Sequence, residues 1–286
     1  HVIAVLTPTC GKCPMCQEGK PFLCREIGRL MSKGTMIDGT TRFRRKGEGV
    51  PQFCGVGSFS ERSVIPAGSA IKVGGNAPLE SVCLIGCGVT TGVGAAVSTA
   101  EVEPGASVAV IGCGGVGLSI IQGARINGAT TIIAIDPVAE KRDLARRLGA
   151  TDVIDPTAED PVKGVRQRTG RLGAHYVFEA LGRIDTVRQA WDMVRPTGRA
   201  IIVGVASFKE TFPLMPGGLL SERRITGSAY GSAVPARDIP RFVSWYLDGR
   251  LKLDEMITKR IRLEDVNQAL DEMTRGEGAR SVIMYN

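Results

Sequence analysis

The chain has 286 residues, of which 43% are hydrophobic and 23% are charged, and its formal net charge is +7. This length and apolar content are typical of an ordinary soluble globular protein with one large core or two moderate ones, and they exclude a small disulfide-stapled secreted scaffold. Lysine and arginine alternate with acidic residues, as in EKRDLARR, so the positive charge does not indicate a nucleic-acid partner.

The chain begins directly with the apolar run HVIAVL, without an initiator methionine or a leading turn. We expect this run to be a strand and the chain to start inside a domain. No signal peptide is recognisable, and clustered thiols in a chain with this much core favour a reducing compartment. The expected location is the cytoplasm.

Four of the eight cysteines follow at once in CGKCPMCQEGKPFLC, with the spacing C-x2-C-x2-C-x7-C. Such a cluster could form disulfides, hold an iron–sulfur or redox-active dithiol site, or bind a structural zinc ion in a closed tetrahedral site. A reducing compartment disfavours disulfides, and no other redox feature lies nearby. We therefore expect Cys10, Cys13, Cys16 and Cys24 to bind structural zinc.

The rest of the first 86 residues has the composition of an irregular β domain, with turn-rich stretches such as KGTMIDGTTRF and short strand-like runs such as FSERSVI. Residues 81–100 and 107–124 lack charged side chains over lengths near a membrane span. Because Gly, Ser and Thr interrupt both, we expect buried strand–turn–helix elements and no membrane association. Cys54, Cys83 and Cys113 are interpreted as core or loop thiols.

From residue 107, short β-rich runs alternate with helical patterns. The predicted strands are 107–112, 130–136, 151–155, 174–181 and 199–205, and the helices between them are 116–127, 139–149, 161–169 and 185–195. This alternation indicates a parallel sheet with crossover helices on both faces. Residues 88–229 are thus predicted to form a doubly wound α/β domain of the Rossmann type. The tail from residue 230, with helices 236–249 and 264–274, could close back onto the N-terminal part.

The first strand of this domain leads into VIGCGGVG, which supplies G-x-G-x-x-G at Gly112, Gly114 and Gly117. The first glycine permits a tight turn, the second lets the backbone approach a pyrophosphate at the helix N-terminus, and the third allows close packing of helix on strand. Asp136 ends the next strand, where a carboxylate accepts hydrogen bonds from ribose hydroxyls and repels a 2′-phosphate. The cofactor is therefore predicted to be NAD and not NADP. Cys113, inside the turn, would be open to modification without cofactor.

A four-cysteine segment ahead of a G-x-G-x-x-G domain resembles the zinc-containing medium-chain alcohol dehydrogenases, and the resemblance runs across the whole chain. Its most specific parts are CGKCPMCQEGKPFLC, KGTMIDGTTRF, GSFSERSVI, LESVCLIGCGVTTGVGAA, GCGGVGLSIIQGA, FEALG and GARSVIMYN. The resemblance implies an incomplete GroES-like β-rich catalytic domain over residues 1–87, to which residues 230–286 return. It also implies two zinc ions in the complete protein, one structural and one catalytic.

The family's catalytic zinc is held by two cysteines and a histidine and polarises the alcohol. Cys87, in LIGCGVTTG, matches the last of these ligands, and Leu6 matches a position that lines the substrate pocket. Thr91 matches a position beside the nicotinamide ring and the substrate, which makes Cys87 and Thr91 the implied catalytic residues.

The resemblance implies further contacts to NAD. Val116 matches a second position beside the nicotinamide, Lys141 one beside the adenosine ribose, and Arg280 one at the pyrophosphate. The remaining matched positions that line the cofactor are Gly115, Ala180, Val205, Ser228 and Tyr230.

Other parts of the family's machinery match positions upstream of HVIAVL. These are the first catalytic cysteine, the histidine with its following glutamate, and the Ser or Thr of the proton relay. Neither His1 nor His175 lies where it could replace the missing ligand. The resemblance therefore implies that about the first quarter of the enzyme is absent, and that the chain alone is inactive.

Family members that oxidise the glutathione adduct of formaldehyde have an arginine four residues after the last clustered cysteine, where this chain has Gly28. That substrate is therefore disfavoured, and the leading hypothesis is an NAD- and zinc-dependent dehydrogenase of a primary or secondary alcohol or its aldehyde. The alternatives are a polyol or thiol-adduct dehydrogenase of the same family and a noncatalytic NAD-binding zinc protein. A zinc-ribbon nucleic-acid module is poorly supported, because only Phe22 supplies an aromatic ring.

The resemblance also implies a homodimer or homotetramer. The segment PLMPGGLLSERRITG, residues 213–227, is the predicted contact between subunits.

Overall fold

The computed structural model describes residues 1–7 and 9–285, apart from the side chain of Arg29, and the chain divides into two compact units. Unit 1 comprises His1–Cys87 together with Ala233–Asn286, and unit 2 comprises Gly88–Ser232. The sequence predicts the corresponding central domain over 88–229. Each unit has its own buried apolar side chains, and each is described separately below.

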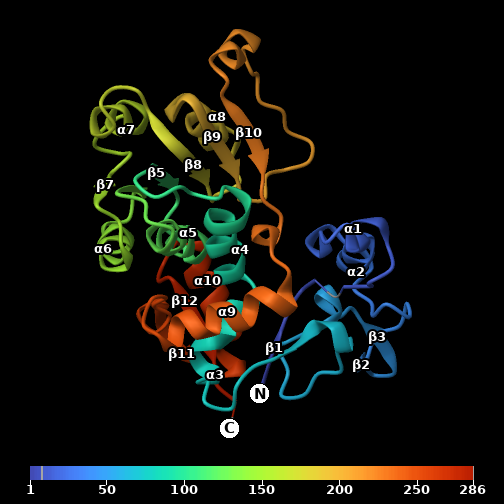
Figure 1. Cartoon of the computed structure of the whole chain (residues 1–286). Helices are drawn as coiled ribbons and strands as arrows, with labels where there is room; N and C mark the ends of the chain where they lie inside the picture. The colour runs from blue at the N-terminus through green and yellow to red at the C-terminus, as the bar shows by residue number, and fades with distance from the viewer. Residues whose placement is uncertain (8, 286) are drawn as a thin grey trace. The chain divides into compact units, whose positions relative to one another are not determined.

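Unit 2 is built on a six-stranded sheet with the order β10-β9-β8-β5-β6-β7, in which every neighbouring pair is parallel (Figure 1). The strands are β5 (Ser107–Ile111), β6 (Thr131–Ile135), β7 (Asp152–Ile154), β8 (Ala174–Glu179), β9 (Val194–Ile202) and β10 (Arg224–Gly227). From β5 the strands are added in one direction, through β6 to β7, and from β8 in the other, through β9 to β10. The strand order therefore reverses between β5 and β8, as in doubly wound dinucleotide-binding domains. The predicted fold class is confirmed.

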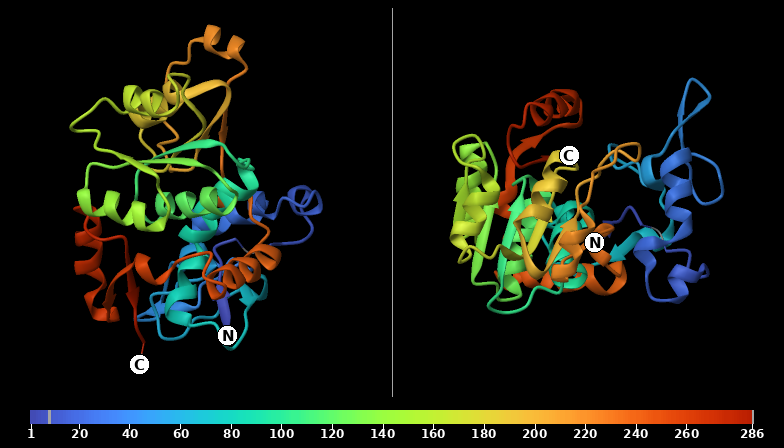
Figure 2. Two further views of the ribbon diagram at one scale, coloured as in Figure 1. Left: turned by 60° about the vertical axis from the view of Figure 1, so that its left-hand side comes forward. Right: turned by 90° about the horizontal axis from the view of Figure 1, so that it is seen from above.

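Helices cover this sheet in two pairs (Figure 2). They are α5 (Gly115–Ile126), α6 (Ala139–Leu148), α7 (Pro161–Arg168) and α8 (Ile184–Met193). Helix α5 contacts α6, and α7 contacts α8. Because both faces are covered, all but the first residue of β5 and β6 are buried, and such strands read as continuous apolar runs.

The uncharged run after residue 88 forms α4 (Gly88–Gly94) and a π-helical turn, η5 (Ala95–Thr99), which pack against α5. A Cβ atom added at Gly92 would lie 2.3 Å from the carbonyl oxygen of Val116, so the two helix backbones approach closely only because the side chain is absent. No single helix in the described part of the chain is long and apolar enough to cross a membrane. The segments Leu79–Gly86 and Gly88–Thr99 reach that length and composition only when taken together.

Over its described residues, unit 1 contains three separate two-stranded sheets. Antiparallel pairs join β1 (Val2–Ala4) to β4 (Ala70–Lys72) and β2 (Phe43–Arg45) to β3 (Glu48–Val50), and a parallel pair joins β11 (Ile257–Ile261) to β12 (Arg280–Ile283). Its α-helices are α1 (Pro14–Gln17), α2 (Arg25–Lys33), α3 (Leu79–Val82), α9 (Pro235–Leu247) and α10 (Val266–Thr274). Helix α9 contacts β4, so the C-terminal segment packs against the N-terminal one within this unit.

Two local predictions differ from the structure. The strand predicted in FSERSVI is wrong, because Ser60 Oγ donates to the carbonyl of Arg62 (2.7 Å) and Ser63 Oγ to that of Gly57 (2.9 Å), and no strand forms there. Hydroxyls that bond to nearby backbone compete with strand pairing. Strand β10 was not predicted, because its largely exposed sequence RITG lacks the apolar signal of the buried strands.

The imidazole of His175, at the start of β8, is held at both ring nitrogens. The backbone N–H of Ser107 donates to Nδ1 (3.1 Å), and Arg195 Nη1 lies 2.7 Å from Nε2. Burial first, and then the charge of Arg195, lower the pKa of His175, while Glu103 opposes the shift. The folded protein therefore favours the neutral ring.

We expect His175 to make the free energy of unfolding fall in mild acid. Above its unfolded-state pKa of about 6.5 the ring is neutral in both states, and as the pH falls below that value the unfolded chain takes up a proton more readily than the folded one. His175→Gln should make the free energy of unfolding depend less on pH between pH 7.5 and 5, as measured by urea unfolding. An unchanged slope in the variant would contradict this assignment.

Candidate functional site

The four clustered cysteines of unit 1 lie close together. The sulfur atoms of Cys10, Cys13, Cys16 and Cys24 are all within 4.8 Å of one another. The separations are 3.9 Å for Cys10–Cys16, 3.5 Å for Cys13–Cys16 and 4.0 Å for Cys13–Cys24. Four ligands at about 2.3 Å from a tetrahedral zinc ion place their sulfurs about 3.8 Å apart, whereas a disulfide needs about 2.05 Å. The donor set therefore fits one closed zinc site.

Local structure forms this cluster. Cys13 caps α1, which Pro14 begins, and one turn later α1 presents Cys16, while Cys24 precedes α2. Backbone N–H groups of Arg25 and Cys16 lower the pKa of the Cys13 thiol to about 6, because they donate hydrogen bonds to the thiolate. Burial raises the pKa of Cys16 to about 12. Zinc binding would therefore release protons, chiefly from the more buried thiols.

The phosphate turn of unit 2, defined as Gly112–Gly117, joins β5 to α5. Gly112 has a φ of +91°, a conformation that side chains rarely adopt. A Cβ added at Gly117 would lie 1.8 Å from the carbonyl oxygen of Gly112, whereas one added at Gly114 would meet no atom within 4 Å. The turn therefore packs tightly at Gly117 and leaves open space at Gly114. This opening at the N-terminus of α5 fits an incoming pyrophosphate.

Asp136 lies beside this turn and is 5% exposed. Its Oδ2 accepts from the backbone N–H of Cys113 (2.8 Å) and its Oδ1 from that of Val138 (2.9 Å). A carboxylate has about four acceptor positions, so both oxygens can still accept from ribose hydroxyls. The neighbouring Arg142 is already paired with Asp155 (3.0 Å).

The expectation that Cys113 is open to modification is wrong. Its side chain is fully buried, and burial raises the pKa of its thiol. Cys113 therefore lacks both the access and the thiolate character that modification requires. Lys141, the predicted ribose-side cation, is half-buried in the first turn of α6.

Three other predicted cofactor residues follow the carboxyl ends of neighbouring strands. Ala180 follows β8, Val205 follows β9 and Ser228 follows β10. They lie on the same sheet edge as the phosphate turn, which is where ligands bind in open α/β sheets.

The sequence offered no role for Glu179, which shapes the turn after β8. Its buried carboxylate accepts from the backbone N–H groups of Leu181 and Gly182 and from Thr186 Oγ1. A carboxylate at the end of an otherwise apolar strand, as in VFEALG, was the available signal.

The predicted nicotinamide positions, Thr91 and Val116, are brought together by the α4–α5 contact at Gly92 described above. Tyr230 lies in the same region, because a Cβ added at the next residue, Gly231, would lie 2.8 Å from the carbonyl oxygen of Thr91. Their contact with a cofactor stays a prediction.

Leu6 and Cys87 line one cavity of about 1060 Å³ in unit 1, termed the Leu6–Cys87 cavity below. The family resemblance implies that Leu6 lines the substrate pocket and that Cys87 is a ligand of the catalytic zinc. Cys54 and Cys83, which the sequence analysis interprets as core or loop thiols, line the same cavity. The rest of the wall is largely apolar, as in Val2, Val5, Phe43, Val50, Pro51, Phe53, Val56, Phe59 and Leu79.

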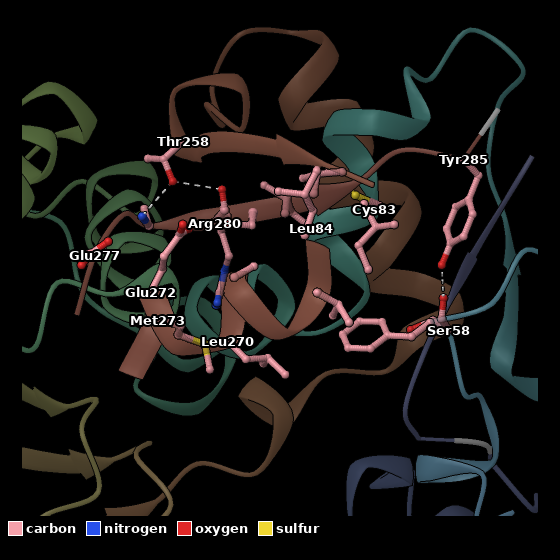
Figure 3. Close-up of a pocket in the computed structure, with 18 residues that line it drawn as sticks. Ser58, Cys83, Leu84, Thr258, Leu270, Glu272, Met273, Glu277, Arg280 and Tyr285 are labelled. Carbon is pink, nitrogen blue, oxygen red and sulfur yellow. Dashed lines mark hydrogen bonds between the residues drawn. The ribbon is translucent and has the colours of Figure 1, made fainter. Parts of the chain in front are cut away.

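Arg280 lines a second cavity of unit 1, of about 400 Å³, where Leu84, Leu270 and Met273 also lie (Figure 3). Burial lowers the pKa of Arg280. Its charge also acts on Cys87, whose pKa is raised by desolvation and partly restored by Arg280. An approach of Arg280 to the pyrophosphate stays a prediction.

Two glycine substitutions separate stability from cofactor binding. Gly117→Ala should destabilise unit 2 by about 1–3 kcal/mol, because its Cβ has no room against Gly112. Gly114→Ala should keep the stability of the native chain but weaken NADH binding about tenfold or more, equivalent to ~1.4 kcal/mol. Thermal unfolding and NADH fluorescence titration measure the two effects. Equal NADH affinity in Gly114→Ala and the native chain would contradict the pyrophosphate assignment.

The chain is similar over its whole length to known proteins. Residues 115–248 match the family model described as zinc-binding dehydrogenase. Over its whole length the chain is 40% identical to the S-(hydroxymethyl)glutathione dehydrogenases of Escherichia coli and Synechocystis sp., and it spans 78% of each relative.

Several solved structures match the whole chain and 77% of their own length, and two of them are at least 29% identical to it. One is an alcohol dehydrogenase zinc-binding domain protein from Burkholderia ambifaria, with a TM-score of 0.95 and 34% identity. The other is a benzyl alcohol dehydrogenase from Acinetobacter calcoaceticus, with a TM-score of 0.91 and 29% identity. With this fold, this phosphate turn and relatives at this level of identity, the chain belongs to the zinc-dependent medium-chain alcohol dehydrogenases, a family of oxidoreductases.

Proposed function

We propose that the chain binds NAD and transfers a hydride between this cofactor and an alcohol or its aldehyde. The observation that carries the proposal is the position of Asp136 beside an open phosphate turn, at the sheet edge that also bears Ala180, Val205 and Ser228. One edge thus offers backbone donors for a pyrophosphate and an acceptor for a ribose.

Within this proposal each group has a binding or positioning task. The N-terminus of α5 holds the pyrophosphate, and Asp136 and Lys141 lie at the ribose. Thr91 and Val116 hold the nicotinamide ring.

Cys87 is one ligand of a catalytic zinc, and a zinc ion there would polarise the alcohol oxygen. The four-cysteine cluster has no open coordination position when its zinc is bound, so its task is to hold residues 10–24 together.

NAD is favoured over NADP by charge. The carboxylate of Asp136 would repel a 2′-phosphate, and the adjacent Arg142 is engaged by Asp155 and by the backbone carbonyl of Asp136 (2.8 Å). An arginine must be available to accommodate a 2′-phosphate. The ion pair with Asp155 therefore keeps Arg142 from binding a 2′-phosphate.

Two substrate classes are suggested by the relatives, a glutathione adduct and an aromatic alcohol. The Leu6–Cys87 cavity favours the second, because its wall is largely apolar and Arg44 is the one cationic side chain among the described residues that line it. Arg44 already donates to the carbonyl of Gly47 (3.2 Å). A glutathione adduct would bring two carboxylates, and each needs a partner if it is to be buried. We therefore propose an alcohol with an apolar body.

The test measures NADH and NADPH binding by fluorescence and alcohol-dependent NADH formation in the same sample. We expect NADH to bind at least about tenfold more tightly than NADPH, and Asp136→Asn to narrow that ratio by about tenfold. Benzyl alcohol should be preferred to S-(hydroxymethyl)glutathione.

Each result bears on a different part of the proposal. Equal binding of the two cofactors would contradict the role of Asp136. NADH binding without turnover of any alcohol would agree with the inactivity that the resemblance implies for the chain alone, and it would contradict hydride transfer by this chain.

We also propose that two copies associate through the edge of the unit 2 sheet. β10 is an edge strand with one neighbour, β9, and the segment before it exposes large apolar side chains. Phe208 is 101% exposed and Leu220 is 90% exposed. An unpaired edge beside exposed apolar side chains is a site for pairing with another chain, and C2 symmetry would let the same edge serve both subunits.

Light scattering coupled to size-exclusion chromatography tests this contact. The native chain should elute as a dimer or a multiple of it, and Phe208→Asp with Leu220→Asp should shift it toward the monomer. Leu172→Asp, at an exposed apolar position elsewhere in unit 2, is the matched control and should leave the mass unchanged. A monomeric native chain would rule out the contact.

A further inference from the structure

The turn that follows β10, termed the 228–232 turn below, has an unusual backbone. Tyr230, Gly231 and Ser232 have φ values of 49°, 66° and 51°, so three successive residues lie in the left-handed region. Glycine adopts this conformation readily, but it costs free energy at Tyr230 and Ser232, which carry a Cβ atom. Such backbone persists only where surrounding contacts hold it, and it is frequent at ligand sites. The contacts that hold the 228–232 turn therefore bear on its task.

Helix α4 holds one side of the 228–232 turn by direct backbone contact. A Cβ added at Gly231 would lie 2.5 Å from the carbonyl oxygen of Thr90, and one added at Gly94 would lie 2.5 Å from that of Gly231. Figure 1 shows this segment, in orange, leaving β10 and passing beside α4. The turn is thus packed on the same helix that approaches α5 closely at Gly92.

The hydroxyl of Thr99 joins the two ends of the 228–232 turn. Its Oγ1 lies 2.8 Å from Ser228 Oγ and 2.8 Å from Ser232 Oγ, which is hydrogen-bond distance for both pairs. A hydroxyl donates one hydrogen bond and accepts up to two, so Thr99 can donate to one serine and accept from the other. Thr99 ends the π-helical turn η5, and π-helical turns are rare and often lie at functional sites.

The strand order relates this turn to the proposed cofactor site. β5 leads into the phosphate turn, and β6, on one side of β5, is followed by Asp136, the proposed ribose acceptor. A dinucleotide lies across the point where the strand order reverses, so its other half extends to the opposite side, over β8, β9 and β10. The 228–232 turn follows β10, and the N–H of Ser228 donates to the carbonyl of Ile202 at the end of β9 (2.9 Å). The turn therefore lies on the side expected for the nicotinamide half.

We propose that Thr99 is a positioning residue for the nicotinamide half of NAD. By bridging Ser228 and Ser232, it keeps the 228–232 turn in its left-handed conformation against α4, which carries Thr91. The inference rests on the proposed function, because it assumes that NAD binds at this sheet edge. Without the bridge, the turn would relax to a commoner conformation and the nicotinamide would lose an ordered surface. The adenosine and pyrophosphate contacts, at β6 and the phosphate turn, would remain.

Calorimetric titration of the full chain with NADH and with ADP-ribose tests this role without any need for activity. ADP-ribose has the adenosine, the pyrophosphate and both riboses of NADH and lacks only the nicotinamide ring. Thr99→Val removes the hydroxyl at nearly constant size, so it should weaken NADH binding about fivefold to tenfold and leave ADP-ribose binding within about twofold. Thr99→Ser keeps the hydroxyl and should bind both ligands as the native chain does.

Thr169→Val is the matched control for the loss of a threonine hydroxyl. Thr169 Oγ1 also makes a hydrogen bond within unit 2, to the carbonyl of Val165 (2.7 Å), but it lies at the end of α7. This variant should bind NADH as the native chain does. Equal weakening of NADH and ADP-ribose in Thr99→Val would indicate a general structural role and overturn the inference, and so would unchanged NADH binding.

Ser232→Ala removes the other end of the bridge and gives the same test if Thr99→Val fails to fold. It should weaken NADH binding in the same way and leave ADP-ribose binding unchanged. Because both substitutions break one bridge, their effects on the free energy of NADH binding should be less than additive in the double variant. Additive effects would contradict the bridge.

The native chain separates this inference from the proposed function. If it binds neither NADH nor ADP-ribose, the proposed cofactor site is wrong and the role of Thr99 is wrong with it. If it binds both and Thr99→Val does not change their ratio, the cofactor site stands and only the role of Thr99 is wrong.

Discussion

The close approach of backbone to backbone at glycine is the constraint on which unit 2 depends. Gly117 lets the first turn of α5 lie against the carbonyl of Gly112, and Gly92 lets α4 lie against Val116. These contacts place the N-terminus of α5 at the end of β5, where its free N–H groups can meet a phosphate. If α5 lay further from β5, the residues predicted to contact the nicotinamide and the pyrophosphate would no longer be held close to one another.

Unit 1 is organised differently, because the strands in its described residues form three separate pairs and no larger sheet. Cysteine sulfurs and buried polar side chains such as Gln52 fix segments that the strand pairs alone do not. The Leu6–Cys87 cavity is lined by short strands and the turns beside them, and the cavity that Arg280 lines is formed mainly by β11, β12 and α10. Loops held by a few anchored residues commonly carry binding groups, and this arrangement brings Leu6, Cys54 and Cys87 to one wall.

Charge arrangement links the cofactor site to its expected selectivity. Asp136 is fixed by two backbone donors, and Arg142 is held by Asp155, so the ribose position presents a carboxylate beside a cation that already has a partner. The Leu6–Cys87 cavity differs from the ribose position, because its wall consists mainly of apolar side chains and thiols and not of charged groups. The two sites thus suit a polar dinucleotide and an apolar alcohol respectively.

The sequence by itself determined the doubly wound sheet, the phosphate turn with Asp136 and the zinc spacing of the cysteines, because each depends on a local pattern of periodicity or residue spacing. It missed β10, which has few buried side chains, and predicted a strand at FSERSVI that serine hydroxyls prevent. Only the tertiary structure could show that Cys113 is buried and that Cys54 shares a wall with Cys87. Burial and proximity depend on contacts between residues distant in the chain, which no local pattern encodes.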